Sequence, residues 1–172
     1  AVLSIIAAGS AAQASTLATW TFETSLPAAT NSAAIGPLAA EVGTGNASGL
    51  HASANTDYSN PAGNGSNESF SANEWAVGDY FQFETSSAGF QGIVLDWDQT
   101  ASNTGPGHFQ LQYSTDGTSY TNSGAVYTVA ANLNPPGFWN ATTYINGYHF
   151  TVNLSSVPAL DNDSSIYFRL TM

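Results

Sequence analysis

Residues 110–121 read QLQYSTDGTSYT, and this stretch indicates the fold more clearly than any other part of the chain. Leu111 and Tyr113 alternate with glutamines, which is the period-two pattern of a β-strand with one apolar face. The Ser-Thr-Asp-Gly sequence that follows is typical of a turn, because Gly117 can adopt positive φ and Asp116 can bond to nearby amides. We therefore predict a β-hairpin whose second strand begins near Tyr120.

Asp116 also suggests a comparison with the Asp box, a hairpin motif of propeller proteins with the pattern S-x-D-x-G-x-x-W. In this chain Gly117 follows the aspartate directly, and the aromatic residue Tyr120 comes one position early. The spacing does not match the motif. We interpret Asp116 as a turn residue and not as a catalytic carboxylate.

Alternation of apolar and polar residues recurs along the chain, whereas helical periodicity is hard to find after residue 15. Segments with this alternation are 16–23, 80–84, 92–98, 108–113, 125–129, 148–154 and 165–172. The intervening stretch 24–73 is rich in Gly, Asn and Ser, and we expect an irregular connection there, with short strands near Leu50 and Ser69. Many short strands with one apolar face predict an all-β chain: a two-sheet antiparallel β-sandwich, jelly-roll-like, with Trp20 and Trp97 in its core.

Composition limits the classes of function. The 172 residues include twelve acidic residues, one basic residue and no cysteine, which gives a formal net charge of -11. This charge repels phosphate backbones and anionic lipids, so we exclude nucleic-acid binding. Without cysteine there is no disulfide, no thiolate zinc site and no cysteine nucleophile. Charged residues make up only 8% of the chain, so hydroxyl and amide groups solvate its surface, as suits an exported or cell-surface protein.

The first residues bear on the compartment. Residues 1–14 read AVLSIIAAGSAAQA, an apolar run followed by small residues that end in the A-x-A pattern of a secretory cleavage site. We expect 1–14 to be the remnant of a signal peptide and 15–172 to form a single sandwich domain. In the alternative, 1–14 is retained as an apolar strand that adds to the sheet of a neighbouring copy. The segment is too short for a transmembrane helix, which needs about 20 apolar residues.

Two pairs of aspartates are candidate cation ligands. Asp96 and Asp98 lie two apart on a predicted strand and so on one face, and Asp161 and Asp163 form an Asp-Asn-Asp turn. Either pair could supply oxygen ligands to a structural Ca²⁺, which tolerates irregular geometry, although neither forms a full loop motif. Capping and solubility explain them as well. Asp96 and Asp98 do not suit glycoside hydrolysis, because strand residues two apart are about 6.6 Å apart and leave no cleft between them.

Histidine, serine and arginine offer no catalytic pattern. His51, His108 and His149 lack the spacing of a zinc site, and we expect them in strands or loops at the surface. No G-x-S-x-G motif occurs among the many serines. Arg169, the only basic residue apart from histidine, is expected on the polar side of the last strand, paired with an acid.

Loop aromatics are the remaining candidates for a binding surface. Trp75, Trp139 and Tyr144 fall in or beside predicted loops, where exposed rings can form stacking platforms for sugars. The same rings could instead plug an end of the sandwich.

Four segments resemble a known group of proteins. They are WAVGDYFQF (75–83), LDWDQTASNTGP (95–106), LQYSTDG (111–117), and LDN (160–162) with YFRL (167–170). In order and wording they resemble the β-sandwich domain of secreted bacterial proteins that end in a PEP-CTERM-type sorting anchor. The resemblance covers about residues 17–172 and is strongest from 75 to 117. It implies an exported surface or matrix protein with no established catalytic residues. The Pro-Glu-Pro motif, apolar helix and basic tail of such anchors are missing, and we expect the chain to be truncated at Met172.

These observations lead to two hypotheses. The first is a non-catalytic extracellular structural or interaction protein, a cell-surface, matrix or filament component that contacts copies of itself or other surface proteins and could assemble by strand addition. The alternative is a carbohydrate-binding module for polysaccharide, with a structural Ca²⁺. A hydrolase is the least supported class.

Overall fold

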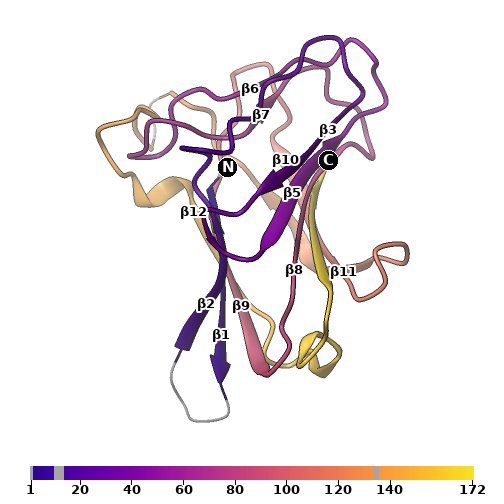
Figure 1. Cartoon of the computed structure of the whole chain (residues 1–172). Helices are drawn as coiled ribbons and strands as arrows, with labels where there is room; N and C mark the ends of the chain where they lie inside the picture. The colour runs from indigo at the N-terminus through magenta and orange to yellow at the C-terminus, as the bar shows by residue number, and fades with distance from the viewer. Residues whose placement is uncertain (1, 10–13, 134–135) are drawn as a thin grey trace.

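A computed structural model describes residues 2–9, 14–133 and 136–172, and shows two antiparallel sheets packed face to face (Figure 1). The five-stranded sheet contains, in spatial order, β12 (His149–Asn153), β9 (Phe90–Asp98), β1 (Val2–Gly9), β2 (Ala14–Trp20) and β4 (Val42–Gly43). The six-stranded sheet contains β11 (Thr121–Thr128), β10 (His108–Ser114), β13 (Ile166–Thr171), β8 (Tyr80–Thr85), β5 (Gly45–Leu50) and β3 (Ala34–Ala39). The predicted β-sandwich is confirmed.

Short elements complete the fold. The strands β6 (Tyr58–Ser59) and β7 (Ser71–Ala72) form a separate pair, and η1 (Asn146–Tyr148) and η2 (Pro158–Leu160) are single 3₁₀ turns. No α-helix occurs within the described ranges. Accordingly, no described helix has the length and apolar character needed to cross a membrane.

The core lies between the two sheets. Trp20 of β2 meets Phe83 of β8 edge to face across the sandwich, with ring centroids 5.3 Å apart. The ring of Trp97 stacks on that of Phe150, with centroids 5.3 Å apart. The apolar face of each strand that was recognised by alternation is the face turned inward, because burying that face removes the most apolar surface from water. Trp20 and Trp97 are buried, as predicted.

The order of the strands follows a jelly-roll pattern. Along the chain, β8, β10, β11 and β13 belong to the six-stranded sheet, whereas β9 and β12 belong to the five-stranded sheet. The chain therefore crosses repeatedly from one sheet to the other, as in a jelly roll. The place between β9 and β2 is filled by the N-terminal strand β1.

β1 is an interior strand of its sheet. It pairs with β2 on one side and β9 on the other, and the side chains of Leu3, Ile5 and Ala7 are at most 1% exposed. In the structure this apolar strand thus completes the sheet of its own chain. The predicted cleavage pattern falls largely on residues 10–13, which lie outside the described residues; Ala14 begins β2.

The predicted hairpin at 110–121 is formed by β10 and β11, with Tyr113 opposite Thr121. One carboxylate oxygen of Asp116 accepts hydrogen bonds from the backbone N–H groups of Ser119 (2.7 Å) and Thr118 (2.8 Å). These bonds, together with one from the Ser114 hydroxyl, hold the pKa of Asp116 well below its usual range. Asp116 is a turn residue, as its spacing indicated.

Some elements differ from the prediction. β2 ends at Trp20, before the expected Glu23, because Phe22 adopts a left-handed conformation (φ 62°) and packs its ring against Phe70. Between residues 24 and 73, β5 and β7 lie near the two expected short strands. β3 and β4 were not predicted, since neither shows alternation: β3 reads AIGPLA and β4 has two residues.

Candidate ligand-binding cleft

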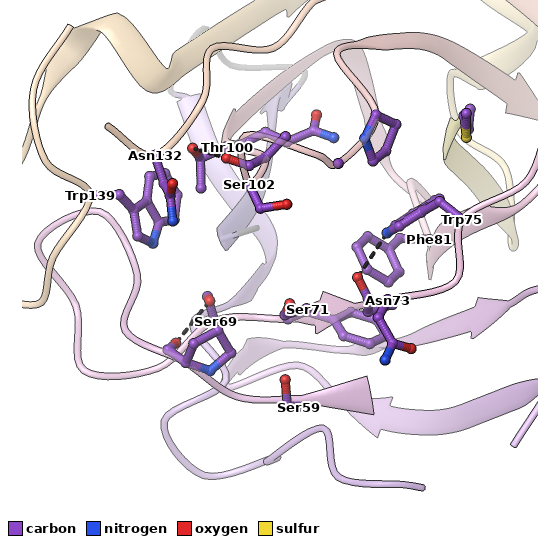
Figure 2. Close-up of a pocket in the computed structure, with 18 of the residues that line it drawn as sticks. Ser59, Ser69, Ser71, Asn73, Trp75, Phe81, Thr100, Ser102, Asn132 and Trp139 are labelled. Atoms are coloured by element: carbon purple, nitrogen blue, oxygen red, sulfur yellow. Dashed lines mark hydrogen bonds between the residues drawn. The ribbon is translucent and has the colours of Figure 1, made fainter. Parts of the chain in front are cut away.

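A cleft of about 750 Å³ lies where loops gather at one end of the sandwich. Three separate parts of the chain form its walls: the β6–β7 region (57–75), the loop after β9 (99–106) and the segment around Asn132 and Trp139. Figure 2 shows these segments around a central space, with Ser102 and Thr100 on one side and Ser69, Ser71 and Asn73 on the other. The volume is within the range of small-molecule sites, about 300–1,000 Å³.

Hydrogen bonds between the loops hold the walls in place. The Asn64 side chain donates to the Ile145 carbonyl (3.0 Å) and accepts from the Ile145 N–H (2.8 Å), which joins the β6–β7 region to the loop before η1. The Asn132 N–H donates to the Ala101 carbonyl (2.8 Å), which joins the other two walls. The loops are thus bonded to each other as well as to the sheets.

Trp75 forms part of one wall. Its indole N–H donates to the Ala72 carbonyl (2.9 Å), and its ring meets Phe81 and Phe109 edge to face, with centroids 5.0 and 5.3 Å away. On a further side it contacts His51, with ring centroids 4.3 Å apart. These contacts fix the ring while it remains partly exposed at the cleft.

Trp139 lies on the opposite side of the cleft (Figure 2). Its indole N–H donates to the Ala62 carbonyl, and its ring packs edge to face on Tyr148, with centroids 5.3 Å apart. Two of the three aromatic residues proposed from the sequence are therefore brought together in one site. Tyr144 is 53% exposed and lies beside His149, and it is not among the residues that line the cleft.

Between the two tryptophans the lining combines hydroxyl and amide side chains with apolar ones such as Phe70 and Phe109. Its hydroxyl and amide side chains are those of Ser59, Ser69, Ser71, Asn73, Gln99, Thr100, Ser102, Thr104 and Asn132. Within the described part of the chain, the hydroxyls of Ser71 and Ser102 and the Asn132 amide have no side-chain hydrogen-bond partner. Asp57 and Glu74 are the only charged residues in the described lining, which holds no His, Tyr, Lys or Arg.

Sequence reasoning did not identify this polar lining. Asn73, Thr100, Ser102 and Asn132 come from three loops and share no motif, and serines and asparagines are common throughout the chain. The available signal was the presence of tryptophans in two of those loops.

Asp96 and Asp98 lie on the outer face of the five-stranded sheet, beside β12. Asp98 Oδ1 is 3.2 Å from His149 Nδ1, and Asp96 Oδ1 is 3.6 Å from His149 Nε2. Thr151 Oγ1 lies 3.1 Å from His149 Nε2 but donates its proton to Asp96 Oδ1 at 2.6 Å. Although Thr151, His149 and Asp98 are spaced like a nucleophile, base and orienting acid, the hydroxyl proton is directed to Asp96, and the group lies outside the cleft. Burial raises the pKa of Asp98, against the effect of its bonds to Asn64 and His149.

Asp161 and Asp163 lie elsewhere, after η2. Asp161 Oδ1 accepts the Gly92 N–H (2.8 Å), and Asp163 Oδ1 accepts the Ser165 N–H (3.0 Å). Gly92 lies near the start of β9 and Asp98 at its end, so the two aspartate pairs do not form one site. Across residues 2–9, 14–133 and 136–172, no three His, Asp or Glu side chains are grouped so that they could hold a metal ion.

His51 and Arg169 differ from expectation. His51 was expected at the surface but is buried, with Nδ1 3.5 Å from Asp79 Oδ2 and Nε2 without a hydrogen-bond partner in the described structure. Burial lowers its pKa, more than the Asp79 carboxylate raises it.

Among the described residues, Arg169 has no acidic partner. Its guanidinium lies between the rings of Tyr80 and Tyr120, 3.8 and 3.5 Å from their centroids. It donates to the Gln82 side-chain oxygen (2.9 Å) and to the Tyr80 hydroxyl (3.0 Å). The expected ion pair is thus replaced by cation–π contacts and neutral hydrogen bonds, which satisfy a planar, weakly hydrated guanidinium well.

Comparison of the chain with protein-family models, with curated proteins and with solved structures gave no match. The resemblance to PEP-CTERM-type proteins stays a prediction, and the inference of function rests on the cleft.

Proposed function

We propose that this chain is a non-catalytic extracellular binding protein whose loop-end cleft holds a neutral, hydroxyl-rich ligand, a segment of polysaccharide. The observation that carries the proposal is the placement of Trp75 and Trp139, far apart in sequence, on opposite sides of one cleft lined between them by hydroxyls and amides.

The chemistry of the lining suits a sugar. Serine, threonine and asparagine side chains both donate and accept hydrogen bonds, as sugar hydroxyls do. Tryptophan rings supply apolar area for the C–H faces of a pyranose at a small loss of conformational entropy. An anionic ligand would be repelled by Asp57, Glu74 and the net charge of -11.

Binding without catalysis is the simpler interpretation of the same lining. Its two carboxylates belong to Asp57, which accepts the Asn31 N–H (3.0 Å), and to Glu74. Both side chains are exposed, so neither has the apolar surroundings in which a glycosidase holds its general acid.

An exported matrix or surface component is the setting that we propose for this binding. Supporting observations are the nearly cation-free composition and the sequence resemblance to secreted sandwich domains. A polysaccharide-binding sandwich would attach such a component to a cell surface or extracellular matrix.

The experiment is native gel electrophoresis in gels that contain neutral polysaccharides, with β-glucan, xylan, mannan and α-glucan as the panel. The strongly acidic chain migrates rapidly, so retardation by a bound polymer is easy to measure. We expect retardation by at least one polymer, and we expect Trp139→Ala to weaken the affinity about tenfold or more through loss of one ring contact. The matched control is Phe138→Ala, because Phe138 is 62% exposed but does not line the cleft.

Two results would overturn the proposal. One is unchanged mobility in every gel; the other is retardation that Trp139→Ala leaves intact. Thermal unfolding of both variants shows whether a loss of binding reflects a loss of fold.

A further inference from the structure

One long stretch of this acidic chain carries no charge. No Asp, Glu, Lys or Arg occurs between Asp116 and Asp161, in a chain with a net charge of -11. This stretch contains β11 and β12, which are the end strands of the six-stranded and the five-stranded sheet. A groove of about 300 Å³ is lined by Ser123, Ala125 and Tyr127 of β11 and by Phe150 and Val152 of β12, so the two end strands flank the same open side of the sandwich.

The uncharged stretch also exposes large apolar side chains. Within it, Val126 is 61% exposed, and Leu133, Phe138 and Tyr144 are exposed as well. Val126 lies on β11 itself, within the bulge in which residues 124–126 face Gln110 of β10. An apolar, uncharged region on a small acidic protein favours contact with another protein surface.

β11 is the least protected of the four sheet edges. Natural edges are blocked by short strands, proline, bulges or charged side chains, because an open row of N–H and C=O groups recruits other strands. β4 has only two residues, and β3 contains Pro37, which lacks an N–H. β12 has five residues and begins at His149, held between the carboxylates of Asp96 and Asp98. β11 has eight residues, no proline and no charge, and within the described sheet it pairs with β10 alone. Its one protective feature is the bulge at residues 124–126.

We propose that two copies of this chain associate through β11, antiparallel about a two-fold axis, so that their six-stranded sheets join edge to edge. A second copy fits this edge for two reasons. An antiparallel pair of identical strands is self-complementary under two-fold symmetry. At this edge, moreover, two molecules of charge -11 can meet without a carboxylate on either paired strand, since β11 itself contains no acid.

The bulge determines which part of β11 is presented. The Gln110 side chain donates to the Ser123 carbonyl (3.1 Å) from the β10 side, and so supports the bulged strand from within the sheet. Tyr127 packs inward against Trp97 and Phe150, while Val126 is directed outward. Two paired strands of eight residues form a small interface. We therefore expect a dimer with a dissociation constant between about 1 µM and 1 mM.

Sedimentation equilibrium of the full chain over that concentration range tests the proposal. We expect reversible dimers of the wild type, and at least a tenfold rise in the dissociation constant for Val126→Glu, which introduces two carboxylates at the joined edges. The matched control is Val77→Glu, in which the same change is made at a residue 89% exposed in the turn before β8. We expect this control to dimerise like the wild type.

Two further measurements test the same dimer. We expect an equimolar mixture of Val126→Glu and Val126→Lys to associate more strongly than either variant alone, because opposite charges then meet. We also expect the amides of residues 121–128 to exchange more slowly as the wild-type concentration rises. The proposal is overturned by a monomer throughout the range, or by a dimer that Val126→Glu and Val77→Glu affect equally.

Discussion

His51 links the core to the cleft at the scale of a single residue. Its ring lies against Trp75, and its Nδ1 faces Asp79, whose carboxylate accepts the N–H groups of Ala52 and Ala76 at 2.7 Å. The residue after Trp75 is therefore bonded to the acid that His51 contacts. A change in the charge of His51 would act directly on the wall that Trp75 forms.

The stability of the fold should decrease as the pH falls through the range in which free histidine titrates. The pKa of His51 is lowered by burial from an unfolded value of about 6.5, so the unfolded chain takes up the proton first. The free energy of unfolding keeps its full value while the pH is above the unfolded pKa. Below that pKa it falls, by up to about 1.4 kcal/mol per pH unit, until the pH reaches the folded pKa. Urea unfolding from pH 7.5 to 5 measures this slope.

Two variants isolate the effect of His51. His51→Phe should flatten the slope, whereas His108→Gln, which alters an exposed histidine, should preserve it. Equal slopes in the wild type and His51→Phe would show that His51 does not control the pH dependence.

At the scale of elements, β1 joins the two halves of the five-stranded sheet. If β1 left the sheet, β2 and β9 would each lose the strand that they pair with on that side. Alternation along β1 buries Ile5 completely and leaves Ile6 partly exposed on the other face.

The same substitution on the two faces of β1 tests this arrangement. Ile5→Ala should lower the free energy of unfolding by about 2–5 kcal/mol, because it leaves a cavity in the core. Ile6→Ala should cost clearly less, since Ile6 is less buried. Urea unfolding of both variants gives the difference. Small and equal effects would mean that β1 does not occupy the sheet interior.

Much of the element level could be predicted from the sequence. The alternation at 80–84, 92–98 and 108–113 closely anticipated β8, β9 and β10, because each strand buries one face and exposes the other. β3 could not be found in this way, because its sequence AIGPLA is small and apolar throughout. The place of β1 could not be found either: an apolar strand buried in a sheet has the same composition as the apolar part of a signal peptide.

The site was predicted only in part, for a related reason. Trp75 and Trp139 were recognisable as loop aromatics, but their meeting across one cleft depends on contacts between loops, such as the Asn64–Ile145 bonds, that leave no local pattern. Arg169 was misjudged because the sequence does not show that Tyr80 and Tyr120 enclose it.

At the scale of the whole molecule, charge repulsion is almost uncompensated. The one basic residue apart from histidine, Arg169, is held by tyrosines and a glutamine, so that twelve carboxylates lack a lysine or arginine partner. Their mutual repulsion destabilises the compact state and is screened by salt.

We expect the melting temperature to rise as NaCl increases from about 10 mM to 0.5 M, where the Debye length falls below about 5 Å.

Adding CaCl₂ or MgCl₂ at matched ionic strength tests the structural Ca²⁺ that the aspartate pairs suggested. Because each pair already accepts hydrogen bonds and the two lie apart, we expect equal effects of the two ions. A larger increase with Ca²⁺, abolished by Asp96→Asn or Asp163→Asn, would instead identify a specific site.

The interior position of β1 also bears on the order in which the chain can fold. β1 pairs with residues 90–98, so β1 cannot complete its pairing in the sheet until the chain has been synthesised as far as β9. Until then the β1–β2 hairpin exposes the apolar face that carries Leu3 and Ile5, and pairings this distant in sequence form slowly. We therefore expect a nascent chain to be prone to aggregation until β9 has been synthesised.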